Sequence, residues 1–340
     1  MNFAFSDDQQ AIKRTARDLL ADRFKMDAVR GLAEAGGYDD AAWSELCELG
    51  WPGIFIDEEL GGQGLGAVEL VILIEELGYA LAPLPFLSNA AAGLVIAAGG
   101  SDEQKERWLP GIASGAARGT VGVLGPDGAA ALVPDADSAH VIVLCGHEGR
   151  TIVERSAADV EVVKTMDHTR RYARVRANGA GQALEGEHLP GLSRACVALA
   201  AELTGIAQRA MELAVEHARE RKQFDRPIGA YQAVSHRCAQ MLMEVEGARS
   251  ASYYAAWTAE AEPETLALAA SMAKAYASDA GWRVCTSALQ VHGGIGFTWE
   301  HDLHFFLKRA RVDGLLYGSA QQHREIVAEL SAPQAAAGVG

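Results

Sequence analysis

The sequence predicts an α+β protein with an N-terminal helical domain at residues 1–117, a small central β domain at 118–190 and a C-terminal four-helix bundle at 191–332. Three observations predict this fold: helix-period apolar residues in the first part, short β-branched runs in the middle, and long helix-period stretches in the last part. Residues 333–340 are of low complexity, and we expect a flexible tail there.

The N-terminal part carries helix-start signals. Ser6 is followed by Gln9, and Ser101 by Gln104, which is the capping-box spacing that satisfies free amides at the start of a helix. Residues 67–81 are apolar on most faces, as expected of a buried helix. We therefore expect this part of the chain to be helical.

The middle part changes character near residue 119. Short runs rich in β-branched residues are separated there by glycine, proline and aspartate, which is typical of strands. We expect strands at 120–124, 130–133, 141–144, 151–153, 160–163 and 173–176.

The last part is again helical, and its breaks fall at prolines or at paired glycines. Long helices joined by short links are typical of an up-down bundle. We expect its helices at about 192–221, 230–261, 264–292 and 303–330.

Composition limits the classes of partner. The formal net charge of −15 disfavours nucleic acid or an anionic membrane as the main partner, because either would be repelled. The N-terminus does not resemble a signal peptide, and the longest apolar run, roughly 90–98, is too short to insert into a membrane. The five cysteines and the histidines have no metal-ligand spacing. We expect a cytoplasmic protein with reduced thiols and no metal.

A first motif, Arg-Lys-Gln-Phe at 221–224, follows the first long helix of the bundle. The guanidinium of Arg221 can donate two hydrogen bonds to a pyrophosphate. Gln223 offers an amide to the same group, and Phe224 supplies an apolar platform. The motif suits the binding of a dinucleotide.

A second motif, Gln-Val-His-Gly-Gly at 290–294, ends the third helix. Gly293 and Gly294 allow a ligand to approach the backbone closely, and Gln290 can hydrogen-bond to that ligand. The motif follows the first by some sixty residues in the sequence.

The two motifs together resemble the R-x-Q-F-G-x-P-I and Q-x-x-G-G-x-G-[FY] signatures of acyl-CoA dehydrogenases, with Asp225 where glycine is usual. The resemblance implies α,β-dehydrogenation of an acyl-CoA thioester with FAD as cofactor and an electron-acceptor flavoprotein as partner. In this family the motif residues reach the FAD of a neighbouring subunit, so a dimer or tetramer is implied. Ser319 and Gln321 are further cofactor contacts that the resemblance implies.

The family's catalytic base, a buried glutamate, has no match in this chain. In many members it lies in a Y-E-G-T-x-x-x-x-R motif, and Tyr317 stands at that position here. Ala195 stands at the second family position of the base. A phenol with a pKa of about 10 is a poor base for this reaction. The nearest carboxylates in the sequence, Glu202 and Asp313, are the minor candidates for a substitute base. Glu202 lies in an apolar stretch, where a satisfied buried polar group or a contact with the flavin or with another subunit is the more usual role.

The β domain also departs from the family. Full-length relatives carry a T-E-x-x-A-G-S-D segment and strands that bind the isoalloxazine ring, whereas residues 123–128 stand near that place without the Thr-Glu or Gly-Ser pairs. Residues 166–171 resemble a D-x-T-R-R segment of shorter, actinobacterial-type members.

These departures favour one hypothesis over two others. The favoured one is a base-lacking subunit of an α2β2 hetero-oligomer that lends its two motifs to FAD held by a homologous, base-bearing subunit. Paired short subunits of this kind occur among dehydrogenases that act on CoA thioesters of steroid side chains. The alternatives are a homo-oligomeric acyl-CoA dehydrogenase with a non-standard base and a non-enzymatic structural relative.

Overall fold

The computed structural model describes residues 4–146, 149–186 and 189–337. Its N-terminal part is helical, as the sequence predicts, and both predicted capping boxes are formed, at Ser6 and at Ser101. The helices of this part are α1 (Asp7–Arg23), α2 (Met26–Ala35), α3 (Asp40–Glu48), α4 (Ala67–Tyr79), α5 (Phe86–Gly99) and α6 (Asp102–Ser114), with short 3-10 turns η1 (Trp51–Gly53) and η2 (Glu58–Leu60).

Two small sheets follow in the middle of the chain. In the described residues, β1, β3, β4 and β7 form one sheet in that order, and β2, β6 and β5 form the other. Only the β1–β3 pair is parallel among the described pairs. The strands are β1 (Gly119–Val123), β2 (Ala130–Pro134), β3 (Val141–Cys145), β4 (Arg150–Glu154), β5 (Ala158–Val163), β6 (Tyr172–Ala177) and the short β7 (Gln182–Ala183), which the sequence did not predict.

The C-terminal part confirms three predicted helices and corrects the fourth. The elements are α7 (Leu189–Glu220), the hairpin β8 (Lys222–Gln223) and β9 (Arg226–Pro227), α8 (Gln232–Ala261), α9 (Leu266–His292), α10 (Leu303–Asp313) and α11 (Ala320–Ala337). The prediction of one helix at 303–330 is wrong, because α10 ends at Asp313 and a loop intervenes. In that loop Tyr317 and Gly318 have φ of 56° and 111°, which no α-helix accommodates.

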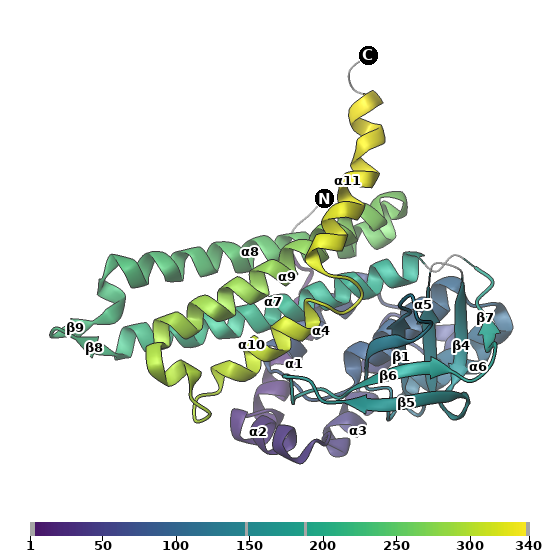
Figure 1. Ribbon diagram of the computed structural model, residues 1–340, viewed down its shortest axis with the longest axis horizontal. Coiled ribbons are helices and arrows are strands. Elements are labelled where there is room, and N and C mark those ends of the chain that lie inside the picture. Colours follow the sequence, from purple (N-terminus) through teal and green to yellow (C-terminus); the bar gives the residue numbers. More distant parts are fainter. Residues whose placement is uncertain (1–3, 147–148, 187–188, 338–340) are drawn as a thin grey trace.

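The arrangement of the parts is visible in Figure 1. The long helices α7, α8 and α9 run side by side, with the β8–β9 hairpin at one tip and the sheets beside the opposite end. Helix α11 projects away from the body and continues to Ala337, into the segment expected to be a tail. Residues 338–340 of that expected tail lie outside the described residues.

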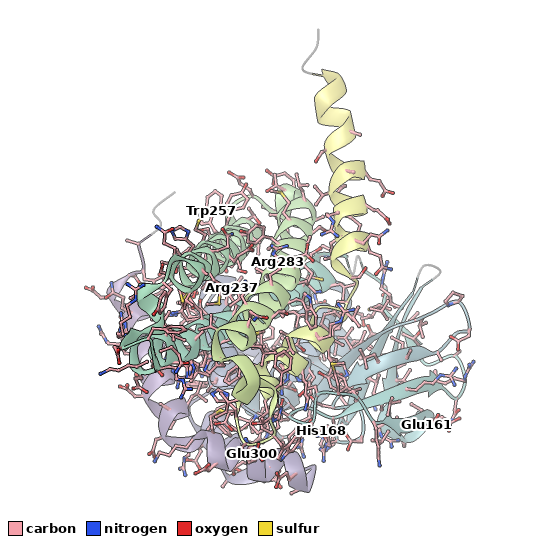
Figure 2. The ribbon with its side chains drawn as sticks, turned by 60° about the vertical axis from the view of Figure 1, so that its left-hand side comes forward. Glu161, His168, Arg237, Trp257, Arg283 and Glu300 are labelled. Carbon is pink, nitrogen blue, oxygen red and sulfur yellow. The ribbon has the colours of Figure 1, made fainter. Side chains whose placement is uncertain are left out.

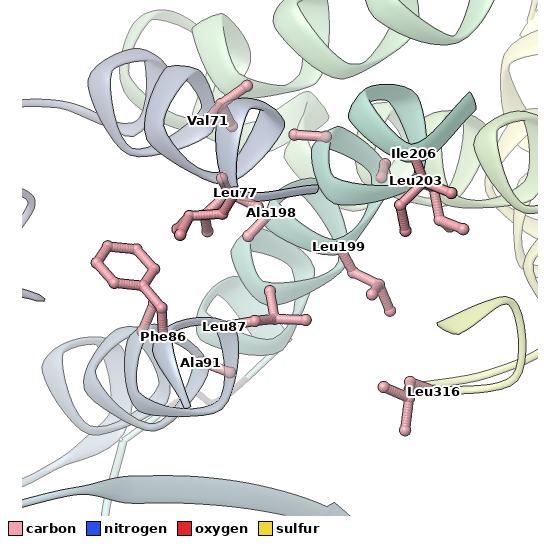
Figure 3. Close-up of a cluster of buried hydrophobic side chains, with 14 of the residues drawn as sticks. Val71, Leu77, Phe86, Leu87, Ala91, Ala198, Leu199, Leu203, Ile206 and Leu316 are labelled. Atoms are coloured by element: carbon pink, nitrogen blue, oxygen red, sulfur yellow. The ribbon is translucent and has the colours of Figure 1, made fainter. Parts of the chain in front are cut away.

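One continuous apolar core joins the N-terminal helices to the bundle. Figure 3 shows Leu77 and Leu87 facing Ala198 and Leu199 of α7, with Leu316 on the far side of that helix. Helices α4 and α7 also cross closely at a glycine, because a Cβ on Gly205 would collide with a backbone carbonyl of α4. Helix α7 therefore occupies the centre of the molecule.

Exposed side chains cover both the sheet side and the bundle side of this core, and they include apolar ones such as Val162 and Met243. Figure 2 shows Glu161 on the sheet side of the molecule and Arg237 and Trp257 on the bundle side. No helix within the described ranges combines the length and the apolar character that crossing a membrane requires.

Candidate functional site

A cavity of about 860 Å³ lies between the sheets and the loop that joins α10 to α11. It brings together two segments that the sequence places almost two hundred residues apart, namely 123–128 and the loop at Tyr317. Its lining is mostly glycine and apolar residues: Val123, Leu124, Gly125, Pro126, Gly128, Ala131, Leu132, Gly146, Gly149, Leu315, Leu316, Tyr317, Gly318 and Gln322.

Tyr317 is held as a neutral phenol at the edge of this cavity. Its side chain belongs to the main apolar core, and only 8% of the residue is exposed. The hydroxyl oxygen is buried and has no hydrogen-bond partner among the described residues. Burial raises the pKa of Tyr317 well above its ordinary value, because an ionised phenol would lose its hydration. Tyr317 therefore cannot accept a proton at neutral pH.

The first motif forms an exposed hairpin at the tip of the bundle. Phe224 is 87% exposed and Phe224 and Asp225 both have positive φ, of 53° and 65°. Aspartate tolerates this left-handed region better than most residues, which explains how Asp225 replaces the glycine of the family pattern. The guanidinium of Arg221 has no ion-pair partner in the described part of the chain. An unpaired cation is thus presented to the outside.

The second motif lies at the same end of the bundle. Helix α9 ends at His292, whose ring stacks on that of His217 of α7 at 4.5 Å between centroids. Gly293 then turns the chain with φ of 66°, and a Cβ on Gly293 or Gly294 would meet no atom within 4 Å. The exposed Gln290 and the open space beside the two glycines give a ligand access to the backbone.

The two motifs and the cavity are far apart in one chain. Cys196, near the start of α7, lies against the carbonyl oxygen of Tyr317, with 4.0 Å between Sγ and O. Arg221 directly follows the end of the same helix. About 24 residues of helix separate the two places, which corresponds to roughly 36 Å at the rise of an α-helix. Figure 1 shows the hairpin at the end of the bundle remote from the sheets.

Comparison with known protein families agrees with this architecture. The family model for the N-terminal domain of acyl-CoA dehydrogenases matches residues 6–116, and the model for the C-terminal domain matches residues 190–331. The chain belongs to the acyl-CoA dehydrogenase family. It is therefore a member of a family of oxidoreductases, and the resemblance and fold class predicted from the sequence are confirmed.

Similar proteins cover almost the whole chain. The acyl-CoA dehydrogenase IpdE2 of Mycobacterium tuberculosis is 36% identical over 93% of this chain and 92% of its own length. IpdE2 of Mycolicibacterium smegmatis is 34% identical over 96% of this chain and 99% of its own. The structure of a variant of the Tcur3481-Tcur3483 steroid ACAD superimposes with a TM-score of 0.89 at 28% identity, covering 97% of this chain and 99% of that one.

FAD, the cofactor expected of an acyl-CoA dehydrogenase, fits the residues at the hairpin end. Arg221 offers a free guanidinium for a pyrophosphate, and Gln290 offers an exposed amide. The absence of any obstacle beside Gly293 and Gly294 leaves room for an adenosine group. The described residues contain no group of three or more His, Cys, Asp or Glu that could hold a metal ion.

The two carboxylates nearest the base positions are committed to a buried ionic cluster. Arg170 donates to Asp313 at 2.9 Å and to Glu202 at 2.6 Å, while Arg309 donates to Asp167 at 2.7 Å and to Glu202 at 3.2 Å. All five residues are buried, and they join the sheet region to α7 and α10.

The cluster sets opposite protonation tendencies on these carboxyl groups. Burial favours the neutral form of Glu202, but the two guanidinium groups overcome it and lower the pKa of Glu202. Burial and the adjacent Glu202 charge raise the pKa of Asp313. Neither carboxylate lines the cavity, and Glu202 already accepts from both arginines. Both arginines donate to Oε1 of Glu202, whereas its Oε2 is buried without a hydrogen-bond partner among the described residues.

The remaining predicted site residues, Ala195, Ser319 and Gln321, are not among the described residues that line the cavity. Ala195 is fully buried on α7, beside Cys196. Ser319 caps α11, accepting from the backbone amide of Gln322 at 3.3 Å, and the side chain of Gln321 donates to Glu325 instead. Gln322, which sequence reasoning missed, lines the cavity. Helical periodicity over residues 320–324 does not indicate which side of the helix faces the cavity, so no signal in the sequence indicated Gln322.

Proposed function

We propose that this chain is the base-lacking subunit of a hetero-oligomeric, FAD-dependent acyl-CoA dehydrogenase. The observation that carries the proposal is the lining of the Tyr317 cavity, whose described residues include no group that could act as the base. The separation of roughly 36 Å between this cavity and the Arg221 hairpin along α7 supports a flavin site shared between subunits. One extended dinucleotide does not reach from one place to the other within a single chain. A complete flavin site must therefore combine the cavity of one subunit with the hairpin end of another.

In this assembly the chain lends its hairpin end to a neighbour. Arg221 would hold the pyrophosphate by paired charge-assisted hydrogen bonds, with Gln223 and Phe224 beside it. Gln290, Gly293 and Gly294 would contact the adenosine part. FAD, when bound, accepts the hydride that leaves the β-carbon of the thioester, and an electron-acceptor flavoprotein would then reoxidise it.

The lining of this chain's own cavity supports the absence of a base. The reaction needs a group that accepts the α-proton near neutral pH. The described lining residues include no carboxylate, histidine, cysteine or lysine, and the phenol of Tyr317 stays protonated. Ala195 offers no acceptor either. A homologous subunit with a buried glutamate would supply the base, in an α2β2 arrangement.

The substrate class rests on similarity alone. The Tcur3481-Tcur3483 protein, whose structure resembles this chain at 28% identity, is a steroid ACAD. A CoA thioester of a steroid side chain is therefore the substrate we propose. The small residues Ala195, Ala198 and Ala201 give no independent support, because all three are buried in the apolar core.

Co-expression tests the proposal directly. The chain is produced alone and together with a homologous acyl-CoA dehydrogenase subunit that carries the glutamate, and native mass and flavin absorbance are recorded. We expect little flavin in the chain alone and a yellow, active hetero-oligomer from the pair. Yellow protein that turns over acyl-CoA from this chain by itself would instead support a homo-oligomer with a non-standard base.

A further inference from the structure

Lys274 of α9 is completely buried, and its ammonium group serves backbone carbonyls rather than a carboxylate. Its Nζ donates to the carbonyl oxygens of Gly314 at 3.2 Å and of Gly318 at 3.0 Å, and to Oγ of Ser278 at 2.9 Å. No ion pair involves it in the described part of the chain. A buried charge is costly unless all of its donors are satisfied, and three acceptors match the three hydrogens of an ammonium.

The two carbonyl contacts fall at the two ends of one loop. Gly314 directly follows α10, and Gly318 lies two residues before α11. The residues between them, Leu315 to Tyr317, line the cavity together with Gly318 itself. A single ammonium group therefore ties both ends of the segment that forms one cavity wall.

This loop needs external support, because its backbone is strained. Tyr317 adopts φ of 56°, a left-handed conformation that an aromatic side chain disfavours. Gly318 follows at φ of 111°, and a Cβ there would come within 3.0 Å of Nε2 of His323. Such a conformation persists only where surrounding contacts impose it.

A second contact supports the middle of the loop. His323 of α11 lies with Nε2 at 3.1 Å from the carbonyl oxygen of Tyr317 and with Nδ1 at 3.2 Å from Oγ of Ser271. With the proton on Nε2, His323 donates to Tyr317 and accepts from Ser271. The carbonyls of Gly314, Tyr317 and Gly318 are thus each held by a side chain outside the loop.

We propose that Lys274 is a positioning residue for the ligand in this cavity, acting through the carbonyls of Gly314 and Gly318. It keeps Leu315, Leu316 and Tyr317 in the conformation that shapes the cavity wall opposite residues 123–128. The ligand class, a flavin ring or the acyl end of a CoA thioester, rests on the function proposed above. The hold of Lys274 on the two ends of the wall follows from its contacts with Gly314 and Gly318, whichever ligand the cavity takes.

Lys274→Met tests the proposal, because methionine nearly fills the same space without the charge. Ser278→Ala is the matched control, since it removes one hydrogen bond of the ammonium but leaves both loop contacts. Hydrogen exchange is followed in peptides over 314–322 and, as an internal reference, over β1, in the full chain in the assembly that it forms. Flavin affinity of that assembly is measured in parallel by fluorescence titration with FAD.

We expect Lys274→Met to accelerate exchange in 314–322 at least tenfold, with β1 unchanged, and to weaken FAD binding by a similar factor. Ser278→Ala should change both by less than twofold.

Unchanged exchange in 314–322, or equal acceleration in β1, would overturn the positioning role. A loosened loop with unaltered flavin affinity would leave the role of Lys274 intact but contradict the assignment of the cavity to the flavin. If Lys274→Met does not fold, Lys274→Gln replaces it and is judged by the same exchange ratio.

Discussion

The two ends of the central helix α7 differ in what they expose. At the hairpin end, Arg221 and Phe224 project outward. Arg221 makes no ion pair within the described residues, and the ring of Phe224 meets that of Tyr231 edge-on at 6.3 Å between centroids. At the cavity end, Tyr317 is enclosed, the carboxylates are paired with arginines, and the loop is tied to α9. A surface that presents an unpaired cation can bind a ligand that is shared with another chain. An enclosed region with paired charges can instead hold the cavity wall in one conformation.

Mutations at the two ends of α7 should therefore affect different properties of the protein. Changes at the cavity end should alter the stability of the fold, because that end is buried and densely bonded. Changes of the exposed residues at the hairpin end, such as Arg221 and Phe224, should alter ligand binding with little effect on folding, since these side chains contact solvent. The predictions below test this contrast, beginning with the largest expected effect.

Arg309→Met should destabilise the chain by about 3–5 kcal/mol, because it leaves Asp167 without its guanidinium partner and Glu202 with only Arg170 in a buried site. Chemical denaturation measures the free energy of unfolding. Arg107→Met is the control, since its ion pair with Glu154 is exposed and should contribute at most about 1 kcal/mol. Equal losses in the two variants would show that the cluster is not a stabilising feature of the cavity end.

Acidification should lower the free energy of unfolding through a buried histidine at each end of α7, His323 at the cavity end and His292 at the hairpin end. Burial lowers the pKa of His323 to about 4 and that of His292 to about 4, from the ordinary value of 6.5. The unfolded chain therefore takes up these protons first, so the stability is complete above pH 6.5 and is lost as pH falls towards 4. Each histidine should account for about 3 kcal/mol over that range.

Unfolding curves at pH 7 and pH 5 of the variants His323→Gln and His292→Gln check this. Each variant should show a smaller loss between the two pH values than the original protein. Hydrogen exchange of residues 314–322 should respond to the substitution of His323. Hydrogen exchange around Gly293 should respond to the substitution of His292. Burial also lowers the pKa of His304 to about 4, so part of the pH dependence should remain in both variants. A pH dependence as large as that of the original protein would contradict the contributions of His323 and His292.

Arg221→Ala should weaken FAD binding to the assembly by about 2–3 kcal/mol, because a charge-assisted hydrogen-bonded group is removed from the hairpin end. The melting temperature should change little, since Arg221 makes no ion pair in the described part of the chain. Arg14→Ala on α1 removes another exposed, unpaired arginine and serves as the control for net charge. Unchanged flavin content in the Arg221 variant would contradict the role proposed for the hairpin.

Tyr317→Phe should have the smallest effect. The hydroxyl has no hydrogen-bond partner among the described residues, so its removal breaks no hydrogen bond. The variant should be more stable than the original protein by less than about 1 kcal/mol. Turnover of the co-expressed assembly should stay within twofold. A loss of turnover by orders of magnitude with intact flavin binding would show that Tyr317 takes part in the proton transfer.

Much of the fold was predictable from local signals. Capping boxes at Ser6 and Ser101, the long helix periods and the β-branched runs are each set by residues close in sequence, and these elements formed where expected. The break between α10 and α11 was not predictable in this way. Its left-handed turn at Tyr317 is held by Lys274, some forty residues earlier in the chain, and helical periodicity continues across it.

In the candidate site, too, local motifs identified some residues, whereas contacts between distant segments were not predictable. Sequence motifs identified Arg221, Gln290, Tyr317 and Ala195, and these residues indicated the family and the lack of a glutamate at both usual positions of the base. No pattern indicated that Glu202 is paired with two arginines or that Gln322 and residues 123–128 line one cavity. Those facts depend on contacts between distant segments.

Short-range periodicity and contiguous motifs were therefore enough to predict the family and most of the helices and strands, but not the break between α10 and α11 or the short β7. Only the packing of distant segments places the hairpin and the cavity at opposite ends of α7, and brings the ammonium group of Lys274 to the carbonyls of Gly314 and Gly318. The physical reason is that burial, which fixes protonation and the cost of an unpaired charge, arises only when distant segments pack together.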